Sequence, residues 1–141
     1  MNILIAVDGS KHTQKALDYL VKHRETFVDK HQLVVAHVCV GITANAARHL
    51  SKEVLKDHYS EESSKVIGPV KAFFESKQIT NFRVEERHGH VAEEILKAAT
   101  SAQAELIVLG THGHGIFGRA LMGSVATKVV AETDITVLLV Q

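Results

Sequence analysis

The apolar residues of this chain gather in short continuous runs that end abruptly at polar or glycine residues. Four such runs stand out, at residues 3–7, 32–40, 104–110 and 134–141. Apolar runs of this length are typical of strands that are buried on both faces of a parallel sheet. A fifth stretch, residues 81–87, alternates apolar and polar positions around Phe82 and Val84, which predicts a shorter strand.

Between these runs, apolar positions recur three and four residues apart, which is the spacing of one helical face. The pattern predicts helices over about residues 11–28, 43–77, 91–99 and 125–132. Ser10 precedes the first of them and can cap its N-terminus. Gly68 and Pro69 fall inside the long second helix, where proline removes an amide donor and clashes with the preceding turn. We therefore expect that helix to kink or break there.

Strands and helices thus alternate strictly along the chain. This order predicts a single α/β domain over residues 1–141, with a five-stranded, mostly parallel open sheet covered by helices on both faces. Ligands of such sheets bind beyond the carboxyl ends of the strands, near the point where the strand order reverses. The segments to search are residues 8–10, 38–41, Gly89 and 110–124, because each follows a predicted strand.

Composition narrows the classes of function that suit such a domain. The chain carries 16 basic and 16 acidic side chains, so no net cationic field draws it to nucleic acid or to an anionic membrane. The one cysteine, Cys39, excludes an intrachain disulfide and fits a reducing compartment, and its apolar surroundings predict a small buried side chain. The first residues contain neither a basic leader nor a long apolar segment, and we expect a cytoplasmic protein.

Five of the nine glycines lie between Gly110 and Ser124, directly after the fourth predicted strand. Gly113 to Gly118 match the pattern G-x-G-x-x-G, but a dinucleotide fingerprint follows the first strand of a βαβ unit and needs an acidic residue about 20 positions on. Gly118 to Ser124 resemble a Walker A loop that lacks its lysine. With both patterns set aside, the spacing Gly110-x2-Gly113-x9-Gly123-Ser124 is left.

This spacing has a physical meaning of its own. Glycine lets the backbone turn tightly behind the strand, and Gly123 with Ser124 opens the next helix. Amides that converge at a helix N-terminus, together with the helix dipole, favour an anion such as a phosphate group. The alternative is that the glycines form only a strand–helix connection in which Ser124 is the N-cap. The residues by themselves leave both interpretations open.

With these segments in order, the chain resembles the universal stress protein family, and within it the ATP-binding branch. That branch carries G-x2-G-x9-G-[S/T], which Gly110, Gly113, Gly123 and Ser124 match without a gap. The stretches ILIAVDGS and AHVCV resemble its first two strands, and GHVAEEILKAATSAQAELIVLGTHG resembles the segment that leads into the glycine-rich loop. The resemblance implies a Rossmann-like fold of the adenine-nucleotide alpha-hydrolase type.

The resemblance also implies which residues surround the base and the ribose. Ala6 and Val7 line the adenine pocket, and the backbone of Val38 meets the base. Asp8 binds the ribose, and Gly110 lies near it. A carboxylate accepts hydrogen bonds from two hydroxyls well, which suits Asp8 to this role. An aspartate before Gly-Ser is also common as a turn or helix-start residue, which is the alternative for Asp8.

For the phosphates, the resemblance implies Gly113, Gly123, the hydroxyl of Ser124 and the amide of Val125. His114 stands where many relatives have a basic residue, so we expect charge compensation at the phosphates to be weaker, to depend on pH, or to come from Arg119 or a metal ion. The implied cofactor is ATP, together with a divalent cation such as Mg²⁺ or Mn²⁺.

Histidines raise the alternative of a zinc site. His88 and His90 could meet His112 and His114, because both pairs follow predicted strands. They lack the helix-based or cysteine context of zinc sites, and we expect solvated or phosphate-facing side chains instead. No serine–histidine–acid set or carboxylate pair can be assigned from spacing, so the sequence names no catalytic residue and no metal ligand.

The closing apolar strand, from Ile135 to Val140, is expected at the edge of the sheet, where an exposed apolar strand invites pairing with another chain. Family members commonly dimerise through this strand, and we predict a homodimer. The leading hypothesis is an ATP-binding, nucleotide-dependent regulatory module of the stress response. The alternatives are a slow metal-assisted ATPase and a nucleotide-free interaction protein of the same fold, with a regulatory partner on residues 43–77.

Overall fold

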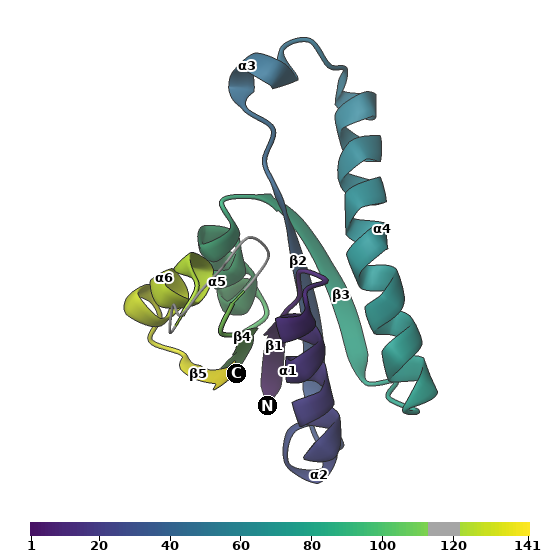
Figure 1. The fold of residues 1–141 in the computed structure, drawn as a ribbon, viewed down its shortest axis with the longest axis vertical. Helices are drawn as coiled ribbons and strands as arrows, with labels where there is room; N and C mark the ends of the chain where they lie inside the picture. Colours follow the sequence, from purple (N-terminus) through teal and green to yellow (C-terminus); the bar gives the residue numbers. More distant parts are fainter. Residues whose placement is uncertain (113–121) are drawn as a thin grey trace.

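The fold is built on one sheet of five parallel strands (Figure 1). The computed structural model describes residues 1–112 and 122–141. The strands are β1 (Asn2–Ala6), β2 (Gln32–Val40), β3 (Phe82–Gly89), β4 (Leu106–Gly110) and β5 (Thr136–Val140). They are ordered β3-β2-β1-β4-β5, and each pair of neighbours runs parallel. The predicted α/β domain with an open parallel sheet is confirmed.

Helices occupy the connections between the strands. The longer ones are α1 (Lys11–Lys22), α4 (Lys52–Ser76), α5 (Val91–Ser101) and α6 (Ser124–Glu132). Two single turns, α2 (Arg24–Phe27) and α3 (Ala44–Ala47), are separate from the long helices. The apolar pattern had predicted one continuous helix in each of these two connections. The predicted cap of α1 is confirmed, because the Ser10 side chain accepts a hydrogen bond from the Thr13 amide. Of the helices in residues 1–112 and 122–141, none has both the length and the apolar composition needed to cross a bilayer.

The sheet separates two apolar cores. On one face, Ile3, Ile5 and Val35 pack with buried residues of α1 and α4. On the other face, Leu4 and Val34 pack with buried residues of α5 and α6. Successive side chains of one strand therefore enter different cores, and each must be apolar. This is why β1 and β2 read as continuous apolar runs in the sequence.

Of the kink or break predicted at Gly68 and Pro69, the break is absent, because α4 runs through both residues to Ser76. Proline 69 lacks the amide that would bond to the Lys65 carbonyl, but Lys65, Gly68 and Pro69 are all exposed. Water can therefore satisfy the freed carbonyl. Buried side chains before and after the proline, Ile67 and Val70, hold both halves of α4 on the same core. Tertiary packing outweighs the local preference of the Gly-Pro pair.

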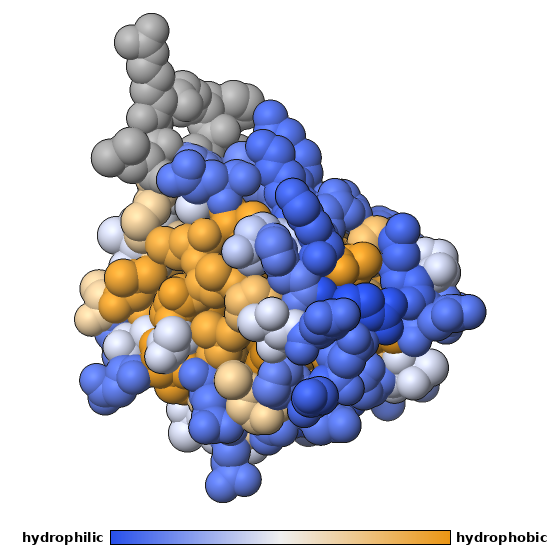
Figure 2. All heavy atoms as spheres, turned by 90° about the horizontal axis from the view of Figure 1, so that it is seen from below, coloured by the Kyte–Doolittle hydropathy of each residue, from blue (hydrophilic) through white to orange (hydrophobic). Residues whose placement is uncertain are grey.

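The two edges of the sheet differ in character. β3 carries charged side chains, and Arg87 makes hydrogen-bonded ion pairs with Glu85 at 2.7 Å and with Glu94 of α5 at 2.8 Å. β5 is the opposite edge, as predicted, and four of its five residues are apolar (TVLLV). Figure 2 shows apolar atoms gathered on the side of the molecule where β5 and α6 lie. Charged side chains on an edge strand disfavour pairing with another chain. The charged edge β3 is therefore protected from such pairing, whereas the apolar edge β5 is not.

Candidate functional site

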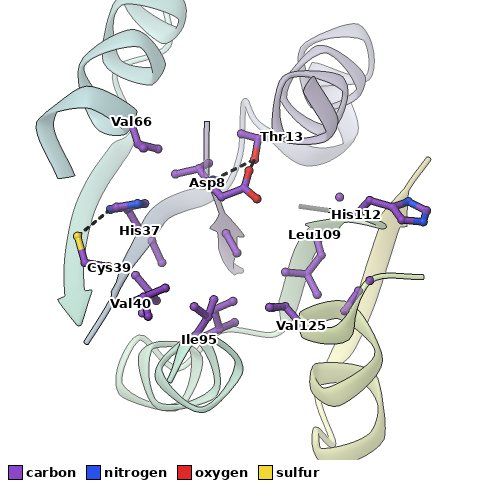
Figure 3. Close-up of a pocket in the computed structure, with 18 of the residues that line it drawn as sticks. Asp8, Thr13, His37, Cys39, Val40, Val66, Ile95, Leu109, His112 and Val125 are labelled. Carbon is purple, nitrogen blue, oxygen red and sulfur yellow. Dashed lines mark hydrogen bonds between the residues drawn. The ribbon is translucent and has the colours of Figure 1, made fainter. Parts of the chain in front are cut away.

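A cavity of about 720 Å³ opens over the carboxyl end of β1, the central strand. α4 forms its wall on one face of the sheet, and α5 with the start of α6 forms the other wall (Figure 3). The chain order reverses at β1, which has β2 on one side and β4 on the other, as expected for a ligand site. The predicted site residues that line the cavity are Ala6, Val7, Asp8, Val38, Gly110, Gly123, Ser124 and Val125. Gly113, His114 and Arg119 lie outside the described residues.

The cavity exists because β2 is longer than β1. The register pairs Ala6 with Ala36, and the last hydrogen bond that the described residues show between these strands runs from the Val7 amide to the Ala36 carbonyl. In a parallel ladder, both polar groups of alternate residues point to the same neighbouring strand. The N–H and C=O of Val38 therefore point past the end of β1, toward the cavity. They offer a ligand one donor and one acceptor.

Asp8 is held firmly at the start of the turn that follows β1. Its Oδ1 accepts hydrogen bonds from the Ser10 amide at 2.9 Å and from the Thr13 hydroxyl at 2.7 Å. The Asp8 amide donates in turn to the Thr13 hydroxyl oxygen at 3.0 Å. These bonds fix the direction of the carboxylate at the cavity wall. Asp8 therefore has the turn role that was the alternative for it, and it also lines the cavity.

The start of α6 corrects the alternative in which Ser124 is the N-cap. Gly123 is the N-cap, and Ser124 is the first residue of the helix. The Gly123 amide donates to the Thr111 carbonyl at 2.6 Å, and the Gly123 carbonyl accepts the bond from the Thr127 amide at 3.0 Å. Amides in the first turn of a helix have no acceptor within it. Those of Ser124 and Val125 are therefore oriented for an anion, whereas the Gly123 amide already has a protein acceptor.

Gly110 is required by a close approach between β4 and α1. A Cβ atom at this position would lie 2.9 Å from His12 Cβ and 3.0 Å from the His12 backbone carbonyl carbon. The His12 ring lies 5.1 Å from the ring of His112, centroid to centroid. Burial, together with the charge of His112, lowers the pKa of His12. The glycine thus has a packing role besides its position in the cavity wall.

His37 and Cys39 form a polar patch on the β2 side of the cavity. His37 Nδ1 lies 2.9 Å from the hydroxyl oxygen of Ser63 in α4, and Cys39 Sγ lies 4.0 Å from the same ring nitrogen. Both side chains are buried, which confirms the prediction for Cys39. Burial lowers the pKa of His37 and raises the pKa of the Cys39 thiol. The sequence analysis singled out Val38 and not His37, so the contact of His37 with the cavity was missed.

The wall formed by α4 was also missed. His58, Glu62, Lys65 and Val66 of this helix line the cavity. Glu62 and Lys65 form an exposed ion pair at 3.0 Å, in which Lys65 lowers the pKa of Glu62 and Glu62 raises the pKa of Lys65. Their spacing places them on one helical face, which was the available signal. Sequence alone could not tell that this face meets a cavity and not open solvent.

The histidines considered for zinc have other neighbours. The His88 ring stacks on Tyr59 of α4 with centroids 4.3 Å apart, and His112 Nδ1 lies 3.0 Å from the Thr111 hydroxyl oxygen. Within the part of the chain that the structure describes, no three His, Cys, Asp or Glu side chains are grouped as metal ligands.

Comparison with known proteins now identifies the family. The universal stress protein family profile matches residues 1–141. The chain belongs to the universal stress protein family. It is 34% identical to a universal stress protein of Thermus aquaticus, over 99% of this chain and 97% of that protein. Its fold is similar to that of the universal stress protein UspA from Lactobacillus plantarum, with a TM-score of 0.80 and 22% identity over 100% of this chain and 97% of the other.

Some solved structures with this fold hold nucleotides. The universal stress protein of Archaeoglobus fulgidus in complex with dAMP has a TM-score of 0.67 and 17% identity, over 100% of this chain and 98% of that one. A family member from Arabidopsis thaliana with AMP bound has a TM-score of 0.69 and 14% identity, over 99% and 90%. A universal stress protein in complex with cAMP has a TM-score of 0.66 and 21% identity, over 100% and 97%. At these identities the likeness shows the fold, and the ligands belong to the relatives.

Proposed function

We propose that this universal stress protein binds an adenine nucleotide, with ATP as its ligand, in the cavity over the end of β1. One observation carries the proposal. Eight of the residues that the family resemblance implies as nucleotide contacts line this one cavity. They lie in β1, β2, β4 and α6 or directly beside these elements, which are far apart in the sequence. The nucleotide complexes of relatives with the same fold support the class of ligand.

The chemistry of the cavity suits the three parts of such a ligand. The Watson–Crick edge of adenine presents a donor beside an acceptor, which complements the C=O and N–H of Val38. The fixed carboxylate of Asp8 suits ribose hydroxyls, because a carboxylate accepts several hydrogen bonds. At the opposite wall, the amides of Ser124 and Val125 and the dipole of α6 suit phosphate oxygens. The order along the cavity is base, ribose and phosphates.

A divalent cation such as Mg²⁺ or Mn²⁺ fits this proposal as a companion of the phosphates. Such cations prefer oxygen ligands, and the Ser124 hydroxyl and the Asp8 carboxylate supply protein oxygens at the cavity wall. The cation would neutralise phosphate charge where His114 stands in place of a permanently basic residue.

We further propose that the protein is a regulatory module of the cytoplasm that works as a homodimer. The apolar, unguarded edge of β5 supports pairing with a second copy. The buried free thiol of Cys39 suits a reducing compartment. In this module, the bound nucleotide sets the arrangement of the start of α6, and a partner protein binds according to that arrangement.

Calorimetric titration of the purified protein with ATP, ADP and AMP tests the proposed ligand. We expect dissociation constants below about 1 mM, the affinity that a few net hydrogen bonds and an apolar pocket provide. Gly123→Val should weaken binding because it adds bulk at a residue of the cavity wall, while the φ of Gly123 (−74°) is one that residues with a side chain adopt. Gly68→Ala, at an exposed position of α4, is the control and should bind like the unchanged protein.

Two outcomes would contradict the proposal. One is a lack of heat change with all three nucleotides at millimolar concentration, in a protein whose circular dichroism shows it folded. The other is equal binding by the unchanged protein and folded Gly123→Val. Phosphate release measured alongside separates binding from slow hydrolysis.

A further inference from the structure

His37 is a buried polar side chain whose function in this cavity is open. Only 7% of the residue is exposed, yet it contributes to the cavity wall. Figure 3 shows its ring between Val66 of α4 and Val40, on the same wall as Cys39. Nδ1 is bonded to Ser63, and among the described residues the other ring nitrogen, Nε2, has no hydrogen-bond partner. Because His37 lines the cavity and Nδ1 is directed to α4, Nε2 is the ring nitrogen available to a ligand.

The surroundings of Ser63 determine which ring nitrogen carries the proton. A serine in a helix often donates to the carbonyl four residues earlier, which for Ser63 is that of Tyr59. Here the Cys39 thiol donates to the Tyr59 carbonyl at 3.7 Å. The Ser63 hydroxyl is left with His37 Nδ1 at 2.9 Å, since its other neighbour, Cys39 Sγ, is a weak acceptor at 3.9 Å. This arrangement favours Nδ1 as the acceptor, with the proton of the neutral ring on Nε2. Burial lowers the pKa of His37, which favours the neutral ring at pH 7.

We propose that His37 is a ligand-binding residue, whose Nε2–H donates to an acceptor atom on the base or ribose of the nucleotide. This inference rests on the proposed nucleotide site. Val38, which is suited to the base, follows His37 directly, and Asp8, which is suited to the ribose, acts on it electrostatically. A phosphate is not the expected acceptor, because the proposed phosphate site at the start of α6 packs on the opposite face of the sheet.

Two conservative variants separate binding from structure. The amide oxygen of asparagine can occupy the place of the acceptor Nδ1, and the amide nitrogen of glutamine reaches the place of the donor Nε2. His37→Asn therefore keeps the contact with Ser63 and loses the donor in the cavity. His37→Gln does the reverse. We expect His37→Asn to bind ATP roughly tenfold more weakly, the value of one hydrogen bond, and His37→Gln to bind within about threefold of the unchanged protein.

Urea unfolding should rank the two variants in the opposite order, with His37→Asn the more stable. His88→Gln, at the same end of the sheet but not in the cavity wall, is the matched control and should retain full affinity. ¹⁵N-edited NMR of the free protein should show the Nε2–H tautomer, with the signal shifting on addition of ATP. A 2′-deoxy nucleotide and a 3-deaza-adenine nucleotide then identify the acceptor. The relevant analogue loses affinity for the unchanged protein but not for His37→Asn.

Equal ATP affinity in the unchanged protein and His37→Asn would overturn the inference while leaving the nucleotide site intact, as would an Nδ1–H tautomer. Absence of binding in the unchanged protein would overturn the proposed function and the inference with it.

Discussion

Asp8 shows how one residue can serve the fold and a ligand together. Its Oδ1 closes the turn after β1 through Ser10 and Thr13, and the same bonds aim the carboxylate at the cavity. The sequence presented the turn and the ribose contact as alternatives. In the structure, the turn bonds fix the side chain at the cavity wall, where the proposed ribose contact would form. A binding group fixed in this way loses little conformational entropy when a ligand arrives.

Buried histidine makes the stability of this domain depend on pH. Burial lowers the pKa of His37 from its ordinary 6.5 despite the opposing charges of Asp8, Glu86 and Glu62. The unfolded chain therefore takes up a proton at a higher pH than the folded one, and stability rises with pH in this range. We expect the free energy of unfolding in urea to be constant above about pH 7.5 and to fall as the pH drops through 6.5 toward 5.

The variant His37→Asn should show a smaller decline over the same pH range, because it removes one of the groups that protonate on unfolding. His12, whose pKa is also lowered, keeps part of the effect. A decline of the same size in both proteins would assign the pH dependence to other groups.

Glycines 110 and 68 allow a direct comparison of a required and a dispensable glycine. At Gly110 a new Cβ would meet the His12 backbone at 3.0 Å, and Gly110→Ala should lower the free energy of unfolding by about 1–3 kcal/mol. At Gly68 no atom lies within 4 Å of a new Cβ, and Gly68→Ala in the exposed helix should raise it by roughly 0.5–1 kcal/mol. Chemical unfolding of both variants measures the difference. Equal effects would show that the approach of α1 to β4 is loose.

At the scale of elements, apolar patterning predicted the strands and the longer helices because each must bury residues in one of two cores. It failed where tertiary contacts decide. The helix α4 passes Pro69 because Ile67 and Val70 anchor it on both sides. β3 extends two residues beyond the predicted Arg87, because pairing with β2 continues from Val38–Arg87 to Val40–Gly89. Neither effect leaves a local signal in the chain.

The two edge strands should behave differently when their outward amides are removed. The Val140 carbonyl accepts from the Thr111 amide, and the Gly89 carbonyl accepts from the Gly41 amide, so both residues direct their polar groups into the sheet. Because this direction alternates along a strand, the amides of Val137 in β5 and Glu86 in β3 point away from the sheet. We expect Val137→Pro to convert the proposed dimer into a monomer, as proline cannot donate across an edge-to-edge pairing. Analytical ultracentrifugation at micromolar protein is the measurement.

Glu86→Pro is the matched control, because it removes an outward amide from the charged edge, and it should remain dimeric. A monomeric mass for the unchanged protein would refute the dimer. A Val137→Pro protein that is folded and still dimeric would move the interface away from β5.

At the scale of the whole molecule, the position of the site could be predicted, but its full wall could not. The strand ends follow from chain order, and Asp8, Val38 and Ser124 fall there by topology. The wall from α4 depends on how a 25-residue helix lies across the sheet, which no motif encodes. His37 was missed for a related reason. Its contact with Ser63 joins two segments 26 residues apart, and burial of both partners becomes visible only in three dimensions.

Thr111 gives the site a link to the rest of the molecule. Its amide holds the last carbonyl of β5, and its carbonyl holds the amide of Gly123 at the start of α6. The edge strand and the proposed phosphate site are thus both hydrogen-bonded to one buried residue. If a nucleotide shifts the dimer equilibrium through this residue, thermodynamic reciprocity requires that dimerisation change nucleotide affinity by the same factor. A cell could then adjust the ligand sensitivity of the protein simply by changing how much of it is made.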